Sequence, residues 1–117
     1  MRLHEHISKE LFSSYAIKIP IGHKCHNLDE LHSCINDINF PVMLKPQLLI
    51  GGRGKAGGVK ILNNIEELAE ASKKLLGKKL ITPQTGPEGR EVKRLYVEES
   101  SSIEKEFYLS CLIDRSS

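Results

Sequence analysis

The residues of this chain best suited to chemistry are three cations set beside a run of glycines. Lys45 ends the apolar segment 42–44, and Arg53 and Lys55 lie within residues 51–58, which contain five glycines. Glycine backbone can approach a ligand closely and adopt positive φ. Because exposed N–H groups and fixed positive charge together bind phosphate, the pattern predicts a phosphate-binding loop.

The spacing of this loop excludes the commonest phosphate-binding motif. A Walker A loop would place Ser or Thr after Gly54-Lys55, where this chain has Ala56. Residues 52–57 match G-x-G-x-x-G, but that pattern marks a dinucleotide fold only where it opens a helix. Here the strand-like segment 59–62 follows. We therefore expect the loop to join two strands and to close over phosphates as a flap.

Lys45 allows two interpretations. On a strand it shares a face with Met43, and no carboxylate lies close to it in sequence. A lysine can protect an exposed strand edge. A cation at the end of an apolar strand otherwise requires an anion, because an unpaired buried charge is costly. The neighbouring glycine loop favours phosphate as that anion.

Composition narrows the class of protein. The chain has 117 residues, 39% of them hydrophobic and 27% charged, which suits at most one domain. A net charge of +2 does not favour a nucleic-acid or membrane partner. The three cysteines are odd in number and widely spaced, which is typical of reduced thiols. We expect a cytoplasmic protein, or one of the mitochondrial matrix in a eukaryote.

Hydrophobic spacing and turn residues predict an α+β chain. Asn27 with Glu30, and Asn64 with Glu67, have capping-box spacing, and Gly77 is a helix stop. The expected elements are helices over 3–16, from Asn27 and from Asn64 to Gly77, a strand at 23–25, a hairpin over 41–62, turns over 82–89, and strands over 92–99 and 104–114.

Two further groups of polar residues are candidates for binding a ligand or a metal ion. Glu98, Glu99, Glu104 and Glu106 cluster near the end of the chain, where composition alone indicates a solvated acidic turn. The histidines and cysteines of residues 23–34 lack the spacing of a metal site. The sequence therefore predicts no metal ligand and no catalytic residue in this chain.

Four stretches resemble the β subunit of succinyl-CoA synthetase, whose family has the ATP-grasp fold. They are residues 1–15, the segment Gly51-Gly-Arg-Gly-Lys-Ala-Gly-Gly-Val-Lys60, residues 76–85 and residues 97–117. They follow in unbroken order over essentially the whole chain. The resemblance implies the N-terminal portion of an ATP-grasp fold, with about residues 1–90 as first lobe and 91–117 as hinge and first strands of the second.

The resemblance also implies a role for individual residues. Lys45 corresponds to a lysine on the nucleotide phosphates, and the glycine flap supplies further contacts. The implied nucleotide-binding residues fall into three groups. They are Lys45, Gly52, Arg53 and Gly54 at the phosphates, Glu98 and Ser101 at the hinge near the base, and Glu106 at the ribose. Pro46 and the pair at 49–50 differ from the usual bacterial residues, so ATP or GTP remain alternatives.

The family reaction converts succinate, CoA and nucleoside triphosphate to succinyl-CoA, nucleoside diphosphate and phosphate, through a phosphohistidine on the α subunit. The family's Mg²⁺ ligands are expected beyond residue 117, so this length of chain should be catalytically silent. Malate–CoA ligase and ATP-citrate lyase share the fold and remain alternatives, as does a stand-alone nucleotide-binding module. The open edge of the predicted strand 104–114 suggests a longer protein or self-association.

Overall fold

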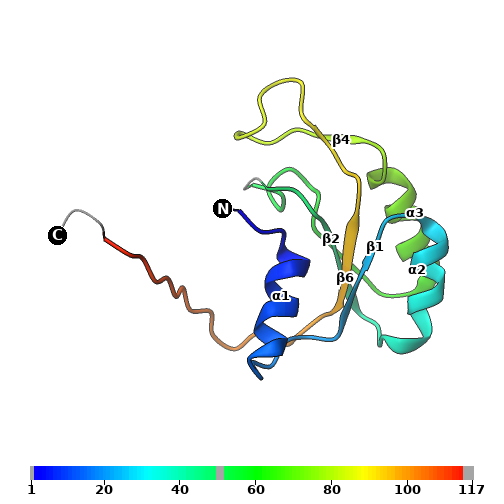
Figure 1. Ribbon diagram of the computed structural model, residues 1–117. Helices are drawn as coiled ribbons and strands as arrows, with labels where there is room; N and C mark the ends of the chain where they lie inside the picture. Colours follow the sequence, from blue (N-terminus) through cyan, green and yellow to red (C-terminus); the bar gives the residue numbers. More distant parts are fainter. Residues whose placement is uncertain (1, 50–51, 115–117) are drawn as a thin grey trace.

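A four-stranded antiparallel sheet forms the centre of the molecule (Figure 1). The computed structural model describes residues 2–49 and 52–114. The strand order is β1-β6-β2-β3, with bounds β1 Gly22–Cys25, β6 Leu95–Glu99, β2 Val42–Pro46 and β3 Lys60–Leu62. The predicted hairpin is confirmed, since β2 pairs antiparallel with β3. β6, which belongs to the segment expected to begin the second lobe, lies between β1 and β2 in this sheet. The division into lobes itself stays a prediction.

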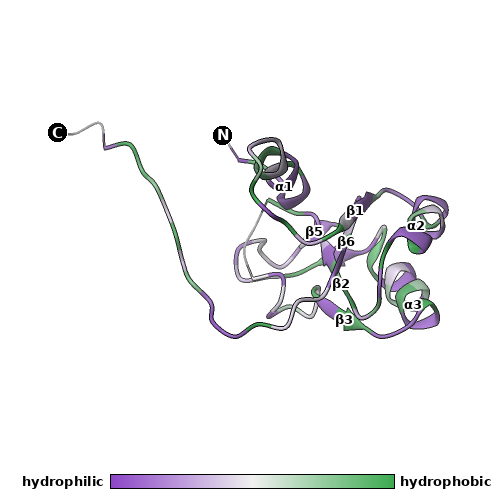
Figure 2. Ribbon diagram, turned by 90° about the horizontal axis from the view of Figure 1, so that it is seen from below, coloured by the Kyte–Doolittle hydropathy of each residue, from purple (hydrophilic) through white to green (hydrophobic). Residues whose placement is uncertain are grey.

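The helices lie on both faces of this sheet. α1, Glu5–Ser14, covers one face, and α2, Leu28–Cys34, and α3, Ile65–Leu75, cover the other (Figures 1 and 2). A short 3₁₀ helix, η1, Ile35–Asp37, continues α2. The three predicted helices are confirmed, with α1 starting and ending slightly inside the expected range 3–16.

The predicted capping boxes start α2 and α3. At α3 the backbone N–H of Glu67 donates to Asn64 Oδ1 at 2.9 Å, and the Glu67 carboxylate accepts from the Asn63 N–H at 2.9 Å. Asn27 caps α2 in the same way. Gly77 follows α3 with φ +74°, a conformation that glycine adopts without strain and that ends helices.

The apolar core lies between the sheet and the pair α2 and α3. Alternate residues of β2 and β6 point into it, as the pleat of a strand requires. Its buried members come from both sheet and helices: Cys25, Leu31, Cys34, Ile38, Val42, Leu44, Leu62, Leu68, Ala71, Leu75, Leu80, Val92, Leu95 and Val97. This face therefore supplies most of the apolar burial that stabilises the fold.

A second, two-stranded sheet carries the turn-rich segment. β4, Lys79–Leu80, pairs antiparallel with β5, Arg90–Glu91, and residues 82–89 connect them through turns, as predicted. None of the helices in the described part of the chain is long and apolar enough to cross a membrane.

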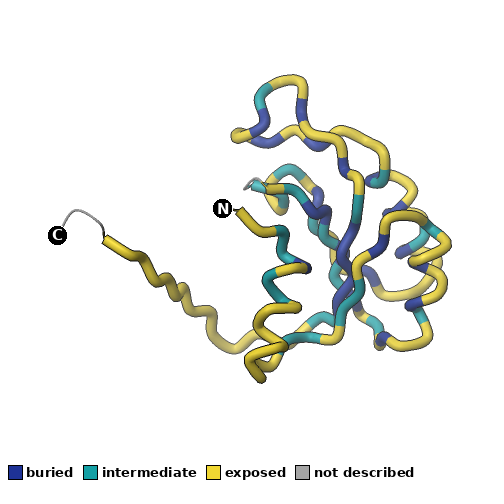
Figure 3. The backbone as a smooth tube through the Cα atoms, in the orientation of Figure 1, coloured by how far each residue is buried: buried dark blue, intermediate teal, exposed yellow. Residues whose placement is uncertain are grey.

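The predicted strand over 104–114 is wrong. Residues 100–114 form no helix or strand, extend away from the sheet and are almost wholly exposed (Figure 3). Phe107 and Leu109 alternate as a strand would, yet their side chains are 87% and 94% exposed. A strand requires hydrogen bonds to a neighbour, and no described segment lies beside these residues. Local alternation was therefore insufficient to form the element.

Candidate functional site

Lys45 points toward α1, away from the apolar core. In β2, Val42 and Leu44 are buried in the core, while Met43 and Lys45 lie on the opposite face and are half-buried. The expectation that Lys45 shares a face with Met43 is confirmed. The side of the sheet that α1 covers is therefore the side that carries the candidate phosphate-binding cation.

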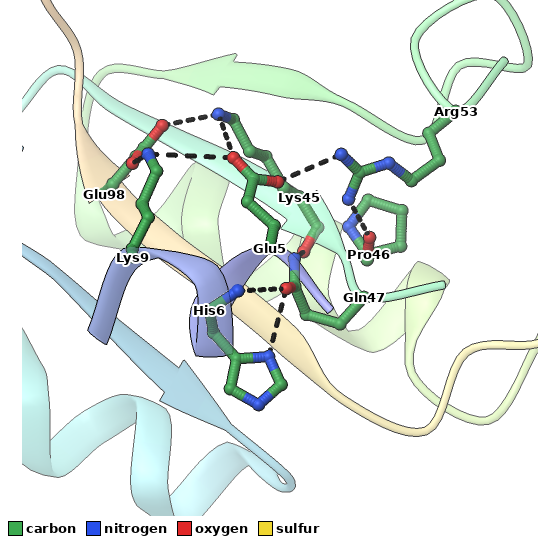
Figure 4. Close-up of polar contacts among 8 residues, drawn as sticks. All are labelled: Glu5, His6, Lys9, Lys45, Pro46, Gln47, Arg53 and Glu98. Carbon is green, nitrogen blue, oxygen red and sulfur yellow. Dashed lines mark hydrogen bonds and ion pairs between the residues drawn. The ribbon is translucent and has the colours of Figure 1, made fainter. Parts of the chain in front are cut away.

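Glu5, in the first turn of α1, bridges Lys45 and Arg53 (Figure 4). Lys45 Nζ donates to Glu5 Oε1 at 2.8 Å, and Arg53 Nη2 donates to Glu5 Oε2 at 3.0 Å. Arg53 Nη1 also donates to the carbonyl oxygen of Pro46 at 2.7 Å. One carboxylate thus holds the cation of β2 and the cation of the glycine loop side by side.

Glu98 completes the group from β6. Lys45 Nζ donates to Glu98 Oε1 at 2.5 Å, and Lys9 of α1 donates to Glu98 Oε2. Lys9 Nζ also lies 3.7 Å from Glu5 Oε1. We call the five residues Glu5, Lys9, Lys45, Arg53 and Glu98 the charge cluster. It combines three cations with two carboxylates and brings together four separate segments of the chain.

Glu5 and Lys45 are both ionised at neutral pH. Burial alone would raise the pKa of Glu5, but the hydrogen bonds and charges of Lys45 and Arg53 outweigh it and hold the pKa below its usual value. Burial would lower the pKa of Lys45, yet Glu5 and Glu98 raise it above its usual value. At the neighbouring Tyr96, by contrast, burial and the charge of Glu98 act in the same direction and raise the pKa to about 12.

A separate contact anchors α1 beside the cluster. The backbone N–H of His6 donates to Gln47 Oε1 at 2.9 Å, and His6 Nδ1 lies 3.1 Å from the same oxygen. Both side chains are buried. α1 therefore rests on the segment that follows β2 through hydrogen bonds rather than through a wide apolar face.

The glycine loop is compact and open on one side. Within it, Ala56 N–H donates to Gly52 O at 3.0 Å and Gly58 N–H to Arg53 O at 2.8 Å. Within the described residues, the N–H groups of Gly54 and Lys55 have no hydrogen-bond partner. A Cβ added at Gly54 would meet no heavy atom within 4 Å. The loop is therefore open around Gly54, while Gly51 lies outside the described residues.

The structure gathers only part of the predicted site. Lys45, Arg53 and Glu98 meet in the charge cluster, and Gly52 and Gly54 lie in the adjoining loop. Lys55 is exposed and contributes no ion pair to described residues. Ser101 and Glu106 lie in the exposed segment 100–114, apart from the cluster. Across residues 2–49 and 52–114, no three His, Cys, Asp or Glu side chains gather as metal ligands.

Sequence reasoning missed Glu5, Lys9 and Gln47. Glu5 and Lys9 are four residues apart and so share one side of α1, a spacing that marks a charged helix side. Nothing in the spacing indicates that this side meets the strand that carries Lys45, forty residues away in sequence. The partner of Lys45 could not be found locally because it comes from another element.

Known proteins are similar to this chain over essentially all of its residues. The β subunit of succinate–CoA ligase [ADP-forming] from Pelagibacter ubique (strain HTCC1062) is 57% identical over 118 residues, which cover 100% of this chain and 31% of that protein. The corresponding subunit from Persephonella marina is 46% identical over 117 residues, 99% of this chain and 30% of that protein. The chain therefore spans less than a third of the length of these relatives.

A solved structure supports the fold alone. Phosphoribosylamine–glycine ligase from Thermotoga maritima superposes with a TM-score of 0.63 at 21% identity, covering 86% of this chain and 23% of that one. Residues 2–117 match the ATP-grasp domain family. These matches confirm the predicted ATP-grasp, α+β fold and the resemblance to the N-terminal part of succinate–CoA ligase β subunits. This protein belongs to the ATP-grasp family.

Proposed function

We propose that this chain forms the phosphate-binding part of the nucleotide site in the β subunit of a succinate–CoA ligase. The observation that supports this proposal most directly is the position of two cations. Lys45 and Arg53 lie side by side, each donating a hydrogen bond to one oxygen of Glu5, next to the glycine loop. Two cations and free backbone N–H groups suit the charge and the acceptor oxygens of a polyphosphate. The names of the relatives support this assignment.

The glycine loop has room for a phosphate group. At Gly54 no heavy atom lies within 4 Å of the place where a side chain would begin, so a ligand oxygen can reach the backbone there. The N–H groups of Gly54 and Lys55 have no partner among the described residues. Gly52, Arg53 and Gly54 therefore suit a flap over the phosphates, with Lys45 beneath it.

The remaining contacts of the nucleotide involve the end of β6 and the residues after it. The resemblance gives Glu98 a place at the hinge near the base, whereas its side chain lies against Lys45, beside the proposed phosphate site. Ser101 follows shortly after β6 and would contact the nucleotide near the base, while Glu106 would hold the ribose hydroxyls. The relatives are ADP-forming enzymes, which favours ATP over GTP as the nucleotide.

Within the whole enzyme, this chain binds and orients phosphates. The reaction would consume succinate, CoA and ATP, with the phosphoryl group passing to a histidine of an α subunit. The charge cluster does not fit a Mg²⁺ site, because Mg²⁺ requires oxygen ligands and the carboxylate oxygens of Glu5 and Glu98 already bind cations. Lys45 and Arg53 supply the positive charge on this side of the polyphosphate.

A calorimetric titration of ATP into the full-length complex tests the proposal. Lys45→Ala should weaken ATP binding about 10- to 100-fold, the range expected for a lost hydrogen bond to a charged group. The matched control is Lys74→Ala, which removes an exposed lysine of α3 on the opposite face of the sheet and should leave the Kd unchanged. Equal affinities of wild type and Lys45→Ala would overturn the phosphate assignment.

The same complex tests the nucleotide and the acid. GTP titrated in place of ATP should bind more weakly, and succinate should support CoA-dependent ATP consumption. Activity with malate or citrate but not with succinate would overturn the succinate–CoA ligase assignment while leaving the ATP-grasp site intact.

A further inference from the structure

We infer that Glu5 is a positioning residue for the nucleotide site. Its carboxylate holds Lys45 and Arg53 at the spacing at which they contact phosphate. The inference rests on the proposed function and deepens it, because it assigns to the N-terminal helix a part in nucleotide affinity. Glu5 itself does not touch the nucleotide.

The geometry makes Glu5 a bridge between two otherwise separate elements. One oxygen accepts from Lys45 on β2, and the other accepts from Arg53 on the glycine loop. Lys45 has a second carboxylate partner in Glu98, whereas the other described partner of Arg53 is the Pro46 carbonyl. A free arginine side chain has many rotamers, and ordering it before the ligand arrives reduces the entropy lost on binding. Arg53 thus depends on Glu5 more than Lys45 does.

Glu5 orders the two cations without saturating them. A lysine ammonium has three N–H donors. Lys45 uses two of them, one to Glu5 and one to Glu98, and the third remains for a ligand. A guanidinium has five N–H donors, and Arg53 makes two hydrogen bonds to described residues. Phosphate oxygens can therefore bind both cations while the Glu5 pairs persist. Glu5 therefore does not have to leave the two cations before a phosphate group can bind them.

α1 has other anchors besides Glu5. The His6–Gln47 hydrogen bonds are buried, and Lys9 binds Glu98. These contacts should hold the helix on the sheet when Glu5 is replaced. A Glu5 variant is therefore expected to fold, so that its effect on ATP affinity can be measured.

The experiment compares ATP Kd values for Glu5 variants of the full-length complex. Glu5→Gln should weaken ATP binding about 10-fold, and Glu5→Asp, which keeps the two charged oxygens, should restore part of the loss. The control Glu10→Gln changes an exposed glutamate of the same helix, whose nearest cation, Lys24, is 3.9 Å away, and should bind ATP as the wild type does. Circular dichroism and thermal unfolding of each variant report whether it is folded.

A double-mutant cycle distinguishes positioning from a general structural effect. If Glu5 acts through Arg53, the loss caused by Glu5→Gln should be clearly smaller in an Arg53→Ala background than in the wild type. Independent, multiplying losses would overturn the inference, and so would tighter ATP binding by Glu5→Gln, which would identify Glu5 as a competitor of phosphate. Unchanged ATP binding by Glu5→Gln would overturn the inference alone. A wild-type complex that binds no ATP would overturn the proposed function and the inference with it.

Discussion

The two faces of the central sheet are held by different forces. Toward α2 and α3, strand residues such as Leu44 and Val97 are fully buried among aliphatic side chains. Toward α1, the same strands present Lys45 and Glu98, and the contacts are ion pairs and hydrogen bonds. On α1 itself, His6 is the buried residue. β2 and β6 thus divide their alternating residues between an apolar core and a charged layer.

We expect this difference to separate stability from the proposed ligand binding. Apolar burial is roughly proportional to area and independent of any ligand. A partly buried group of charges adds little net stability, because desolvation offsets most of the attraction between its members. Such a group instead holds its charges in fixed positions, and this preorganisation favours the binding of an anionic ligand. The apolar face should therefore control folding, and the charged face should control nucleotide affinity.

The largest expected effect on stability comes from a substitution in the apolar face of the sheet. Leu44 is 0% exposed, so Leu44→Ala should reduce the free energy of unfolding by about 2–5 kcal/mol through lost burial and a cavity. Urea unfolding monitored by circular dichroism measures it. Met43→Ala, one residue earlier and on the other face, is the matched control and should cost much less. Equal losses at the two positions would contradict the division of the strand.

A pair of glycine substitutions sharpens the comparison within the loop. A Cβ at Gly58 would lie 3.0 Å from both Pro46 Cγ and the Arg53 carbonyl oxygen, so Gly58→Ala should cost about 1–3 kcal/mol by overpacking. Gly54→Ala adds its methyl group to open space and should change stability by less than about 0.5 kcal/mol.

The same pair is then titrated with ATP. Gly54→Ala should weaken binding although its stability is unchanged, because the methyl group occupies the approach to the loop backbone. If Gly54→Ala binds ATP like the wild type, the open side of the loop is not where the phosphates lie.

The pH dependence of stability tests the charged face. The folded pKa of Glu5 is lower than its usual value of 4.5, so its contribution is fully present above that pH and is lost as the pH falls through the folded pKa. Glu5→Gln should cost roughly 1–2 kcal/mol at pH 7, in the range of hydrogen bonds to charged groups. The difference from wild type should shrink as the pH falls below 4.5. A difference independent of pH between 7 and 3 would show that the Glu5 charge does not stabilise the fold.

The smallest effect concerns a helix cap on the apolar side. Asn64→Ala removes the acceptor of the Glu67 N–H and should cost about 1 kcal/mol, measured as a shift in the urea midpoint. Asn63→Ala is the control, since Asn63 contributes its backbone N–H rather than its side chain. Neither change should alter the ATP Kd, because α3 lies on the face opposite the charge cluster. A changed Kd would show that the two faces are coupled.

Local elements of the fold were predictable from the sequence. The capping boxes at Asn27 and Asn64 began helices, and the glycine loop joined two antiparallel strands. These features depend on residues within a few positions of one another. The segment 104–114 shows the limit, because its alternating apolar residues formed no strand without a neighbouring strand.

The candidate site was predictable only in part. Lys45 and Arg53 were identified because charge beside bare backbone has a direct chemical meaning, whereas Lys55, chosen on the same ground, lies outside the charge cluster. The resemblance added Glu98, which lies against Lys45, and Ser101 and Glu106, which do not approach the cluster in this structure. The roles of all three toward a nucleotide stay predictions.

The amino-acid sequence by itself determined the helices, the hairpin, the glycine loop and the presence of cations beside it, because hydrophobic period, capping and backbone freedom are local properties. The tertiary structure alone decided which charges meet. Glu5, Lys45 and Glu98 are separated by 40 and 53 residues in sequence, and they come together because β2 and β6 pair in one sheet and α1 packs on the face to which Lys45 and Glu98 point. Ion pairing depends on distances in space, and only the folded arrangement of elements sets those distances.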